Sequence, residues 1–490
     1  MSSPTAALLP GAAPIIVLGA GVAGLATAYR LAELGRGPVV VLEQAPAAGG
    51  LAGTVEFGGA RFDLGSHRVH PDYYPDALAL LRTLLGEDLL CVPRRGRLRF
   101  QGGYIDYPPS LADFLAALGA REVARCAAGL LAARLRGTPG DGGPPSYADH
   151  LLPRVGPRAF ELFYAPYARK VFGLAPEAVA ASAAKTRIST ARPWALAWQM
   201  ARLARRPAAA AGGGSNGGGR VFYYPRHGFG SIGDALRDAV RARGVTLRTG
   251  VTVRGLRAVH GRVVEVEVEA DGVASVLPAA AVVSSAPLAA LLRMVTPAAP
   301  AAVTAAADSL RWRGIRLLQV VLARPRCLDG ETYYFPEEAY CFGRVSEPPL
   351  FSAALRGAPG TTALNVEVIC TAGDALWTLD EEAFLRRVQD DAEPLGLFHA
   401  AEVRAARSLR LPAVYPVYDR DYRARLDRAL GWVSGFDNLY SIGRGGLFLH
   451  ANTDHSIHLG LRLAEHLARP GARAAAWDAL LPGDGMTVRD

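Results

Sequence analysis

The chain has 490 residues, half of them hydrophobic, so it can bury a large core and is expected to fold as two domains or lobes. Its formal net charge is +9, but only Lys170 and Lys185 are lysines, and the arginines are spread along an alanine- and glycine-rich chain. No basic run is interleaved with aromatic residues as a stacking groove for nucleic acid requires, so we expect no nucleic-acid partner.

The cysteines predict neither a zinc site nor a disulfide framework, because they are odd in number and form no CxxC pair. They are Cys91, Cys126, Cys327, Cys341 and Cys370. A reducing cytoplasm is therefore the expected location. The first residues lack the basic start of a signal peptide, and no uncharged stretch is long enough to span a bilayer, so we expect a chain that is soluble or at most peripheral to a membrane.

The first predicted unit is a strand over Ile15–Leu18, a glycine turn and a helix over Leu25–Leu34. The turn has the spacing GxGxxG, and its glycines are Gly19, Gly21 and Gly24. Between a strand and a helix, this spacing is typical of a turn that lets the backbone approach a pyrophosphate, whose charge the helix N-terminus stabilises. The alternative is an ordinary strand and helix in which the glycines contact no ligand.

A second apolar strand, PVVVLEQ, ends in Glu43. Its distance from the glycine turn is typical of an acid that accepts a hydrogen bond from a ribose 2′-hydroxyl. A carboxylate there would repel a 2′-phosphate, so we expect a dinucleotide without one. Gly49 and Gly50, followed by Thr54, would let a second loop lie close to the cofactor. These residues leave FAD and NAD both open.

The segment GSHRVHPDYY, which starts at Gly65, follows an alternating strand pattern and raises three alternatives: a metal site, a catalytic cluster or ordinary surface. His67 and His70 are three residues apart in a predicted loop, without an acidic or cysteine partner at metal-ligand spacing. We therefore expect no metal site in this segment.

Near the C-terminus, NLYSIGRGGLFLHANTDHSIHLGLRLAEHL predicts a short strand, a turn at Gly443 and Arg444, and a long helix from about Ser456. A helix N-terminus directed at a cofactor would stabilise negative charge on it. Asn452, Asp454 and His455 precede the predicted helix and are candidate caps, with a catalytic role as the alternative for Asp454.

Together these motifs resemble those of a large group of FAD enzymes that includes amine oxidases, protoporphyrinogen oxidase, phytoene desaturases and UDP-galactopyranose mutase. The resemblance implies an α/β fold of the GR2-like flavoprotein kind, with a Rossmann-type FAD-binding domain and a discontinuous mixed α+β substrate domain. It also implies FAD as the cofactor. The residues that it places at the FAD are Gly19, Gly21, Gly24, Glu43, Gly49, Gly50, Gly65, His67, Gly443 and Arg444. Many relatives have an arginine where this chain has Ala48 or Ala52, so a phosphate or flavin contact would come from elsewhere.

The same resemblance divides the chain into two domains. The FAD-binding domain is expected over 1–90, 221–290 and 415–480, and the substrate domain over 91–220 and 291–414. The segment 206–219 is glycine-rich and is expected to be a flexible linker. Before it, RPWALAWQMARLARRP predicts a cationic amphipathic helix, either a lid on the substrate domain or a helix on a membrane surface. The expected partners are a small-molecule substrate and, in the second alternative, a membrane.

Further segments resemble UDP-galactopyranose mutase. GSHRVHPDYY resembles the segment that lies against the flavin ring in those enzymes, which implies flavin contacts for Gly65 and His67 and a place for Arg68 in the substrate cavity. RRGRLRFQGGYIDYPPS resembles their strand pair. In YAPYARKVFGLAPEAVAASAAKTRI, Arg187 matches an arginine of the mutases, while Phe172 stands where their substrate-stacking tryptophan would be.

Two tyrosine-proline segments, FYYPRHGFG and YPVYDRDY, resemble segments that reach a sugar nucleotide in the mutases. The tyrosines that this nominates are Tyr223, Tyr224, Tyr415 and Tyr418, with core packing as the alternative for each. The residues expected in the substrate site are Arg68, Arg187, Tyr224, Arg344 and Tyr415. Those expected to act in catalysis are His67, Arg187 and Tyr415.

Two reactions compete. In the first, an FAD-dependent oxidoreductase of the dehydrogenase, desaturase or oxidase type transfers a hydride from a small molecule to the flavin. In the second, a mutase-like enzyme isomerises a sugar nucleotide through reduced flavin. Where many amine oxidases carry a lysine near the flavin, this chain has Arg311, Arg313 and Arg316, which stay charged and cannot replace it. The missing tryptophan argues against a strict mutase, so we expect the oxidoreductase; a non-catalytic flavin-binding protein is the third alternative.

Overall fold

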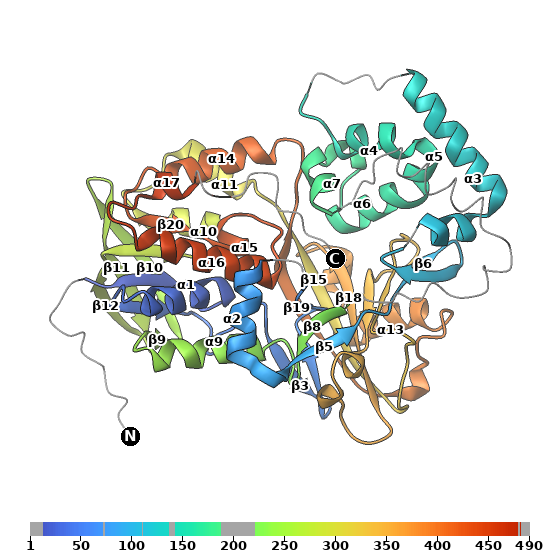
Figure 1. Ribbon diagram of the computed structural model, residues 1–490, viewed down its shortest axis with the longest axis horizontal. Helices are drawn as coiled ribbons and strands as arrows, with labels where there is room; N and C mark the ends of the chain where they lie inside the picture. The colour runs from blue at the N-terminus through green and yellow to red at the C-terminus, as the bar shows by residue number, and fades with distance from the viewer. Residues whose placement is uncertain are drawn as a thin grey trace.

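The computed structural model describes residues 13–71, 74–109, 111–136, 143–187, 221–478 and 481. The predicted amphipathic helix at 192–207 and the predicted linker at 206–219 lie outside these residues. The described elements form three groups: a parallel sheet with its helices, a larger mixed sheet, and a cluster of helices at one corner of the molecule (Figure 1).

The parallel sheet has five strands and contains the strand predicted at Ile15–Leu18. In spatial order the strands are β20 (Leu439–Ser441), β13 (Ala281–Ser284), β1 (Ile15–Leu18), β2 (Val39–Leu42) and β9 (Thr246–Arg248). Successive side chains of a strand point to opposite faces, so Ile16 and Leu18 enter one apolar cluster and Val17 enters another. Both faces are therefore covered, as is typical of a parallel sheet.

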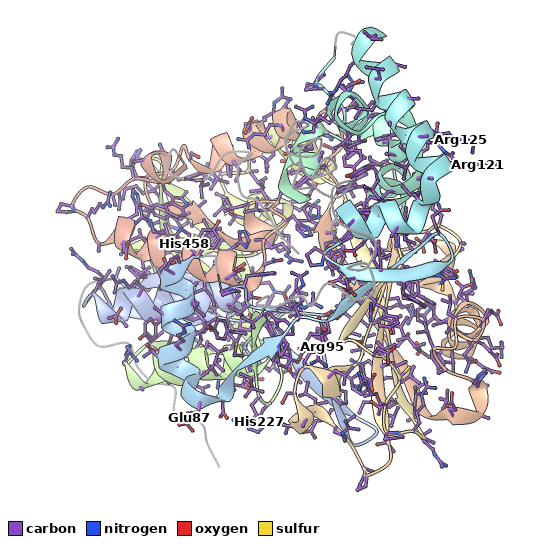
Figure 2. The ribbon with its side chains drawn as sticks, turned by 45° about the vertical axis from the view of Figure 1, so that its right-hand side comes forward. Glu87, Arg95, Arg121, Arg125, His227 and His458 are labelled. Atoms are coloured by element: carbon purple, nitrogen blue, oxygen red, sulfur yellow. The ribbon has the colours of Figure 1, made fainter. Side chains whose placement is uncertain are left out.

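Three helices cover one face of this sheet: α1 (Val22–Glu33), α9 (Ser231–Ala242) and α16 (Thr453–Leu467). A fourth, α2 (Pro75–Leu85), packs against α16, and there His458 Nδ1 lies 2.7 Å from Asp76 Oδ2 (Figure 2). Residues of a four-stranded sheet contribute to the apolar cluster on the opposite face. Its strands are β12 (Val273–Pro278), β11 (Arg262–Ala270), β10 (Val251–Val259) and β14 (Val295–Thr296).

The larger sheet has seven strands and includes the strand pair predicted in RRGRLRFQGGYIDYPPS. In spatial order the strands are β19 (Val403–Pro416), β15 (Trp312–Leu322), β18 (Thr362–Cys370), β17 (Arg344–Ser346), β16 (Thr332–Tyr334), β6 (Gly96–Phe100) and β7 (Gly103–Tyr107). On one face, helix α13 (Glu381–Ala392) buries Phe384 and Val388 against it. The remaining described strands form two two-stranded sheets: β3 (Thr54–Phe57) with β4 (Ala60–Asp63), and β5 (Leu89–Pro93) with β8 (Val221–Pro225).

The helical cluster extends from the end of the larger sheet that carries β6 (Figure 1). Its main helices are α3 (Leu111–Arg136), α4 (Tyr147–Val155), α6 (Ala165–Phe172) and α7 (Ala181–Arg187). Helix α3 changes direction at Gly119, whose φ is 72°, and it exposes Arg121 and Arg125 on its outer side (Figure 2). Within the residues described, no helix is both long and apolar enough to cross a bilayer.

Candidate functional site

One cavity of about 1460 Å³ brings together the motifs that the sequence places far apart. Its lining residues come from the glycine turn before α1, the end of β2, the loop after β4 and the turn after β20. The remaining lining residues come from the seven-stranded sheet and the helical cluster. We call the side formed by the parallel sheet the cofactor end, and the side formed by β6, β7, β16, β17, α3 and α6 the substrate end.

Each of the three glycines in the glycine turn is explained by a different structural requirement. Gly19 has φ +98°, a left-handed conformation, and a Cβ on it would overlap Ser285 Oγ. A Cβ on Gly24 would overlap the carbonyl oxygen of Gly19. Gly21 lines the cavity, and a Cβ on it would meet no atom within 4 Å. Only the middle glycine therefore keeps open space on the cavity side.

Helix α1 starts directly after this turn, with Gly21 as its N-cap and no side-chain cap. Its first residues, Val22 and Ala23, line the cavity. The first N–H groups of a helix have no partner within the helix, and the helix dipole adds partial positive charge. The cofactor end therefore has the properties of an anion site.

Glu43 follows β2 and lines the same end of the cavity. Its Oε2 accepts the N–H of Ala20 at 2.7 Å, and its Oε1 accepts the N–H of Ala45 at 2.8 Å. These two bonds fix the carboxylate beside the glycine turn. A carboxylate offers about four acceptor positions, so it can still accept hydroxyl groups from a ligand.

The paired glycines lie against the glycine turn. The N–H of Gly49 donates to Ala20 O at 2.8 Å, and Gly50, with φ +60°, would place a Cβ 3.2 Å from the Cα of Gly21. A side chain at Gly50 would crowd the turn, which explains why glycine follows the acid at this distance.

The C-terminal motif lies beside the glycine turn, but its helix starts earlier than expected. Gly443 has φ +76°, and the Arg444 guanidinium donates to Val414 O at 2.9 Å and to Ala451 O at 3.0 Å. Helix α16 starts at Thr453 rather than near Ser456. The capping predictions for Asp454 and His455 are therefore wrong.

Asp454 instead lies in the first turn of α16, where it is buried and its Oδ1 accepts the N–H of His455 at 3.0 Å. The N-cap residue, Asn452, makes no side-chain capping bond. Residues of this helix terminus, including Thr453 and Ser456, line the cavity. A second uncapped helix N-terminus therefore reaches the cavity.

The loop after β4 places a neutral histidine between the two ends of the cavity. Gly65, with φ +142°, lets the chain turn, and the N–H of Ser66 donates to Glu367 Oε1 at 2.7 Å. His67 lines the cavity, and its ring lies 4.9 Å from that of Phe229. Burial, aided by Arg344 and Arg444, lowers the pKa of His67 to about 3.

Two expected substrate residues, Arg68 and Arg344, line the cavity and are held by acids. Arg68 donates to Tyr334 Oη at 2.6 Å and lies 3.2 Å from Glu331. Arg344 donates to Glu367 Oε2 at 2.6 Å. Burial opposes the charge of Arg344, but its neighbours, Glu367 above all, hold its pKa above the ordinary value.

The tyrosines divide between cavity and core. Tyr415 lines the cavity, and its ring stacks on His450 with centroids 5.2 Å apart. Tyr224 is not among the lining residues. It is a core residue of β8 that donates its hydroxyl to Asp63 at 2.6 Å, and burial raises the pKa of Asp63 to about 6. Tyr418 is buried as well, and its hydroxyl accepts the N–H of His450 at 2.8 Å. We therefore do not keep Tyr224 in the substrate site.

One residue named in the mutase resemblance does not reach the described cavity. Phe172 is buried in an apolar cluster beneath α6 and is absent from the lining. The side chain of Arg187 lies outside the described residues. Lys170, also on α6, does line the cavity and donates from Nζ to Phe335 O at 2.6 Å and to Glu337 O at 2.7 Å. Burial lowers its pKa to about 8.

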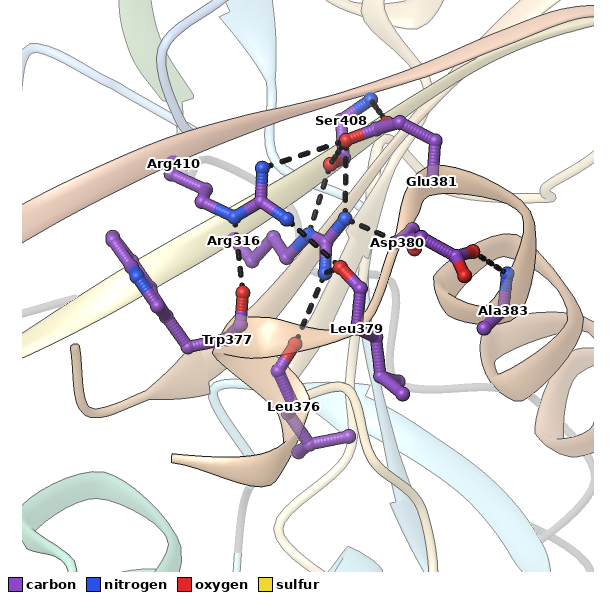
Figure 3. A network of polar contacts seen from close by, with 9 residues as sticks. All are labelled: Arg316, Leu376, Trp377, Leu379, Asp380, Glu381, Ala383, Ser408 and Arg410. Atoms are coloured by element: carbon purple, nitrogen blue, oxygen red, sulfur yellow. Dashed lines mark hydrogen bonds and ion pairs between the residues drawn. The ribbon is translucent and has the colours of Figure 1, made fainter. Parts of the chain in front are cut away.

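The arginines of RWRGIRLLQVVL do not line the cavity. Arg316 on β15 is completely buried on the side of the sheet that α13 covers. It donates to Ser408 Oγ at 2.9 Å and to Leu379 O at 2.6 Å, and it lies 3.1 Å from Glu381 (Figure 3). Arg316 therefore joins β15 to the segment before α13 and has a structural role.

Sequence reasoning missed most of the substrate end. Aromatic side chains from β7, from α3, from α6 and the helical turn before it, and from the end of β16 form much of its wall. They are Tyr107, Phe114, Phe163, Tyr164, Tyr167, Tyr334 and Phe335. Arg94, between β5 and β6, also reaches it. These residues share no sequence motif, although the alternation of basic and apolar residues in RRGRLRF is a signal for a strand with one polar face.

Residues 22–410 match the model of a protein family described as flavin containing amine oxidoreductase, which is well over half of the chain. The chain belongs to this family. Membership in the flavin-containing amine oxidoreductases implies a flavin cofactor, and the predicted relationship to this superfamily of FAD enzymes is confirmed.

Solved structures similar to this family member cover nearly the whole chain. A reduced UDP-galactopyranose mutase is 19% identical with a TM-score of 0.77, and the match covers 95% of this chain and 98% of that chain. An Exiguobacterium protein assigned as a protoporphyrinogen oxidase is 17% identical with a TM-score of 0.70, covering 94% and 99%. Cyclohexylamine oxidase from Brevibacterium oxydans is 14% identical with a TM-score of 0.61, covering 94% and 99%. At these identities the likeness establishes the fold alone.

Proposed function

We propose that this chain is an FAD-dependent oxidoreductase with a Rossmann-type cofactor fold that acts on a small molecule. The observation that carries the proposal is that a single cavity is lined by the glycine turn, by Glu43 and by the turn at Gly443 and Arg444. These groups suit a dinucleotide, and Gly21 leaves open space where a side chain would fit.

The cofactor end has the donors and acceptors that FAD requires. The N–H groups at the start of α1 would bind the pyrophosphate, and the open face of Gly21 would let it approach the backbone. Glu43 would accept a ribose hydroxyl. Gly49 and Gly50 would keep the second loop against the turn. Gly65, His67 and Arg444, with the uncapped start of α16, would surround the ring portion.

When bound, the flavin supplies a two-electron acceptor that can take a hydride from a substrate carbon. The protein orients that carbon with the groups on the far side of the cavity, and Arg344 and Tyr415 are the proposed contacts. His67 is neutral because of its low pKa, so it can accept a hydrogen bond without placing positive charge beside the substrate. Arg187 remains a proposed catalytic residue.

A mutase-like enzyme is the second candidate, because the substrate end carries arginine and lysine side chains that suit the phosphates of a sugar nucleotide. Arg94, Lys170 and Arg344 all line it, and Glu367 is the acid that pairs with one of them. In this alternative the same cofactor end is retained, and the substrate is isomerised without net oxidation.

The experiment starts with the purified protein. Heat-released flavin is identified and counted, and one FAD per chain is expected; protein that retains no flavin contradicts both candidates. The holoenzyme is then reduced with dithionite without oxygen and given UDP-galactopyranose. The oxidoreductase proposal expects no furanose product. Catalytic formation of the furanose isomer without consumption of reductant would overturn it in favour of the mutase.

A further inference from the structure

Arg94 is a cavity-lining arginine with unused hydrogen-bond donors. It lies between β5 and β6, and its guanidinium carbon is 5.3 Å from the ring centroid of Tyr107. Its Nε and Nη2 are buried, and among the described residues neither has a hydrogen-bond partner. No described carboxylate lies within ion-pair distance of it.

Every other arginine that lines the cavity already has a partner. Arg68 pairs with Glu331, Arg344 with Glu367 and Arg293 with Asp308, while Arg444 donates to backbone carbonyls. N–H donors that are buried without a partner lose their hydration, which costs free energy. An anionic ligand would supply the missing partner.

The surroundings of Arg94 hold it in place. The N–H of Arg95 donates to Glu331 Oε2 at 2.8 Å, which fixes the turn. The Tyr107 ring, which faces the guanidinium, packs against Tyr334 with ring centroids 4.0 Å apart, and Tyr334 accepts a hydrogen bond from Arg68. A fixed guanidinium loses little conformational entropy when it binds a carboxylate or phosphate through two N–H groups.

The wall at the same end of the cavity is aromatic. Phe114, Phe163 and Tyr167 line this end of the cavity, and the rings of Phe114 and Phe163 are 5.5 Å apart. These rings would bury an apolar or aromatic body, because they offer area and few hydrogen bonds. The site therefore combines one unpaired cation with an apolar wall.

We propose that Arg94 binds an anionic group, a carboxylate or a phosphate, of a substrate whose remaining body is apolar or aromatic. This rests on the proposed function, because it takes the cavity as the substrate site. It adds the chemical class of the substrate and a specificity-determining residue that was not among the expected substrate residues.

The test uses three probes that share a phenyl group: 3-phenylpropionate, phenyl phosphate and the neutral 3-phenylpropanol. Equilibrium dialysis measures their binding to the holoenzyme, to Arg94→Gln and to Arg95→Gln. Arg95 is the matched control, because it is the next residue and its side chain is exposed (Figure 2). Flavin content is measured in every sample.

We expect at least one of the two anions to bind more tightly than the alcohol, and Arg94→Gln to weaken that anion by about ten-fold or more, as loss of a charge-assisted hydrogen bond requires. Arg95→Gln should bind like the wild type. The tighter of the two anions identifies the group as carboxylate or phosphate. Two outcomes overturn the proposal when every sample has its full flavin content. One is equal binding of the anion by Arg94→Gln and the wild type, and the other is no preference for either anion over the alcohol. Absence of flavin from the wild type instead overturns the proposed function.

Discussion

The two ends of the cavity use different parts of the chain. At the cofactor end, the surface is largely backbone: the glycine turn, the paired glycines and the uncapped starts of α1 and α16. At the substrate end, the surface is made of long side chains from separate elements, among them Arg94, Lys170 and Tyr334. Backbone groups can bind a cofactor that is the same in many enzymes, whereas side chains can change with the substrate. The predictions below test this division.

The largest effect is expected at Arg316, which supports the sheet behind the substrate end. Arg316→Met removes a completely buried guanidinium and leaves Leu376 O and Ser408 Oγ without their donor. We expect the free energy of unfolding to fall by about 3–5 kcal/mol, because each buried acceptor left without a donor costs about 1–3 kcal/mol. Urea denaturation measures the change.

Arg410→Met is the matched control for this variant. Arg410 donates to Leu379 O at 2.8 Å but is well exposed, so its loss should cost about 1 kcal/mol or less. Equal losses for Arg316→Met and Arg410→Met would contradict a structural role for the buried arginine.

The sequence predicted the cofactor end of the cavity better than the substrate end. Gly19 and Gly21 could be recognised because a left-handed turn and an open backbone face require glycine whatever surrounds them. The strand at Ile15–Leu18 was readable because both faces of a parallel sheet are apolar. By contrast, Arg94 meets Tyr107 only after β6 and β7 have paired, and no local pattern records that contact.

The errors have physical causes too. Asp454 was expected to cap α16, but tertiary packing extends the helix to Thr453 and buries the carboxylate within its first turn. Tyr224 and Phe172 have the residue types of a binding site, yet each turns into the core. Periodicity cannot tell which side of an element faces a cavity when both sides are covered. The domain limits and the cytoplasmic location remain predictions.

At the cofactor end, Glu43→Ala should weaken FAD binding by about 1–3 kcal/mol, the cost of a lost buried hydrogen bond to a charged group. The variant should still fold, because only the N–H groups of Ala20 and Ala45 lose an acceptor. Titration of apoprotein with FAD measures the affinity. Glu33→Ala, at the exposed end of α1, should bind FAD like the wild type. Unchanged affinity in Glu43→Ala would refute the ribose contact.

At the junction of the two ends, His67 should make the stability of the apoprotein depend on pH. Its pKa is about 3 when folded, whereas an unfolded histidine titrates near 6.5, so between these values only the unfolded chain binds the proton. As the pH falls from about 6.5 towards 3, the wild type should therefore lose stability relative to His67→Gln, by up to about 1.4 kcal/mol per pH unit. The difference between the two denaturation curves isolates this residue. A difference independent of pH would show that His67 has the same pKa in the folded and the unfolded chain, and would contradict the account.

The most direct measurement of the central claim is FAD affinity in Gly21→Ala. The backbone φ of −70° suits alanine, and the added Cβ would meet no protein atom within 4 Å, so the variant should fold with the melting temperature of the wild type. Gly431→Ala, another glycine with open space around it, is the control. If the open face of Gly21 receives the dinucleotide, Gly21→Ala will bind FAD about ten-fold more weakly or worse, a loss of about 1.4 kcal/mol, while the control is unchanged. A folded Gly21→Ala that binds FAD as tightly as the wild type would contradict the account.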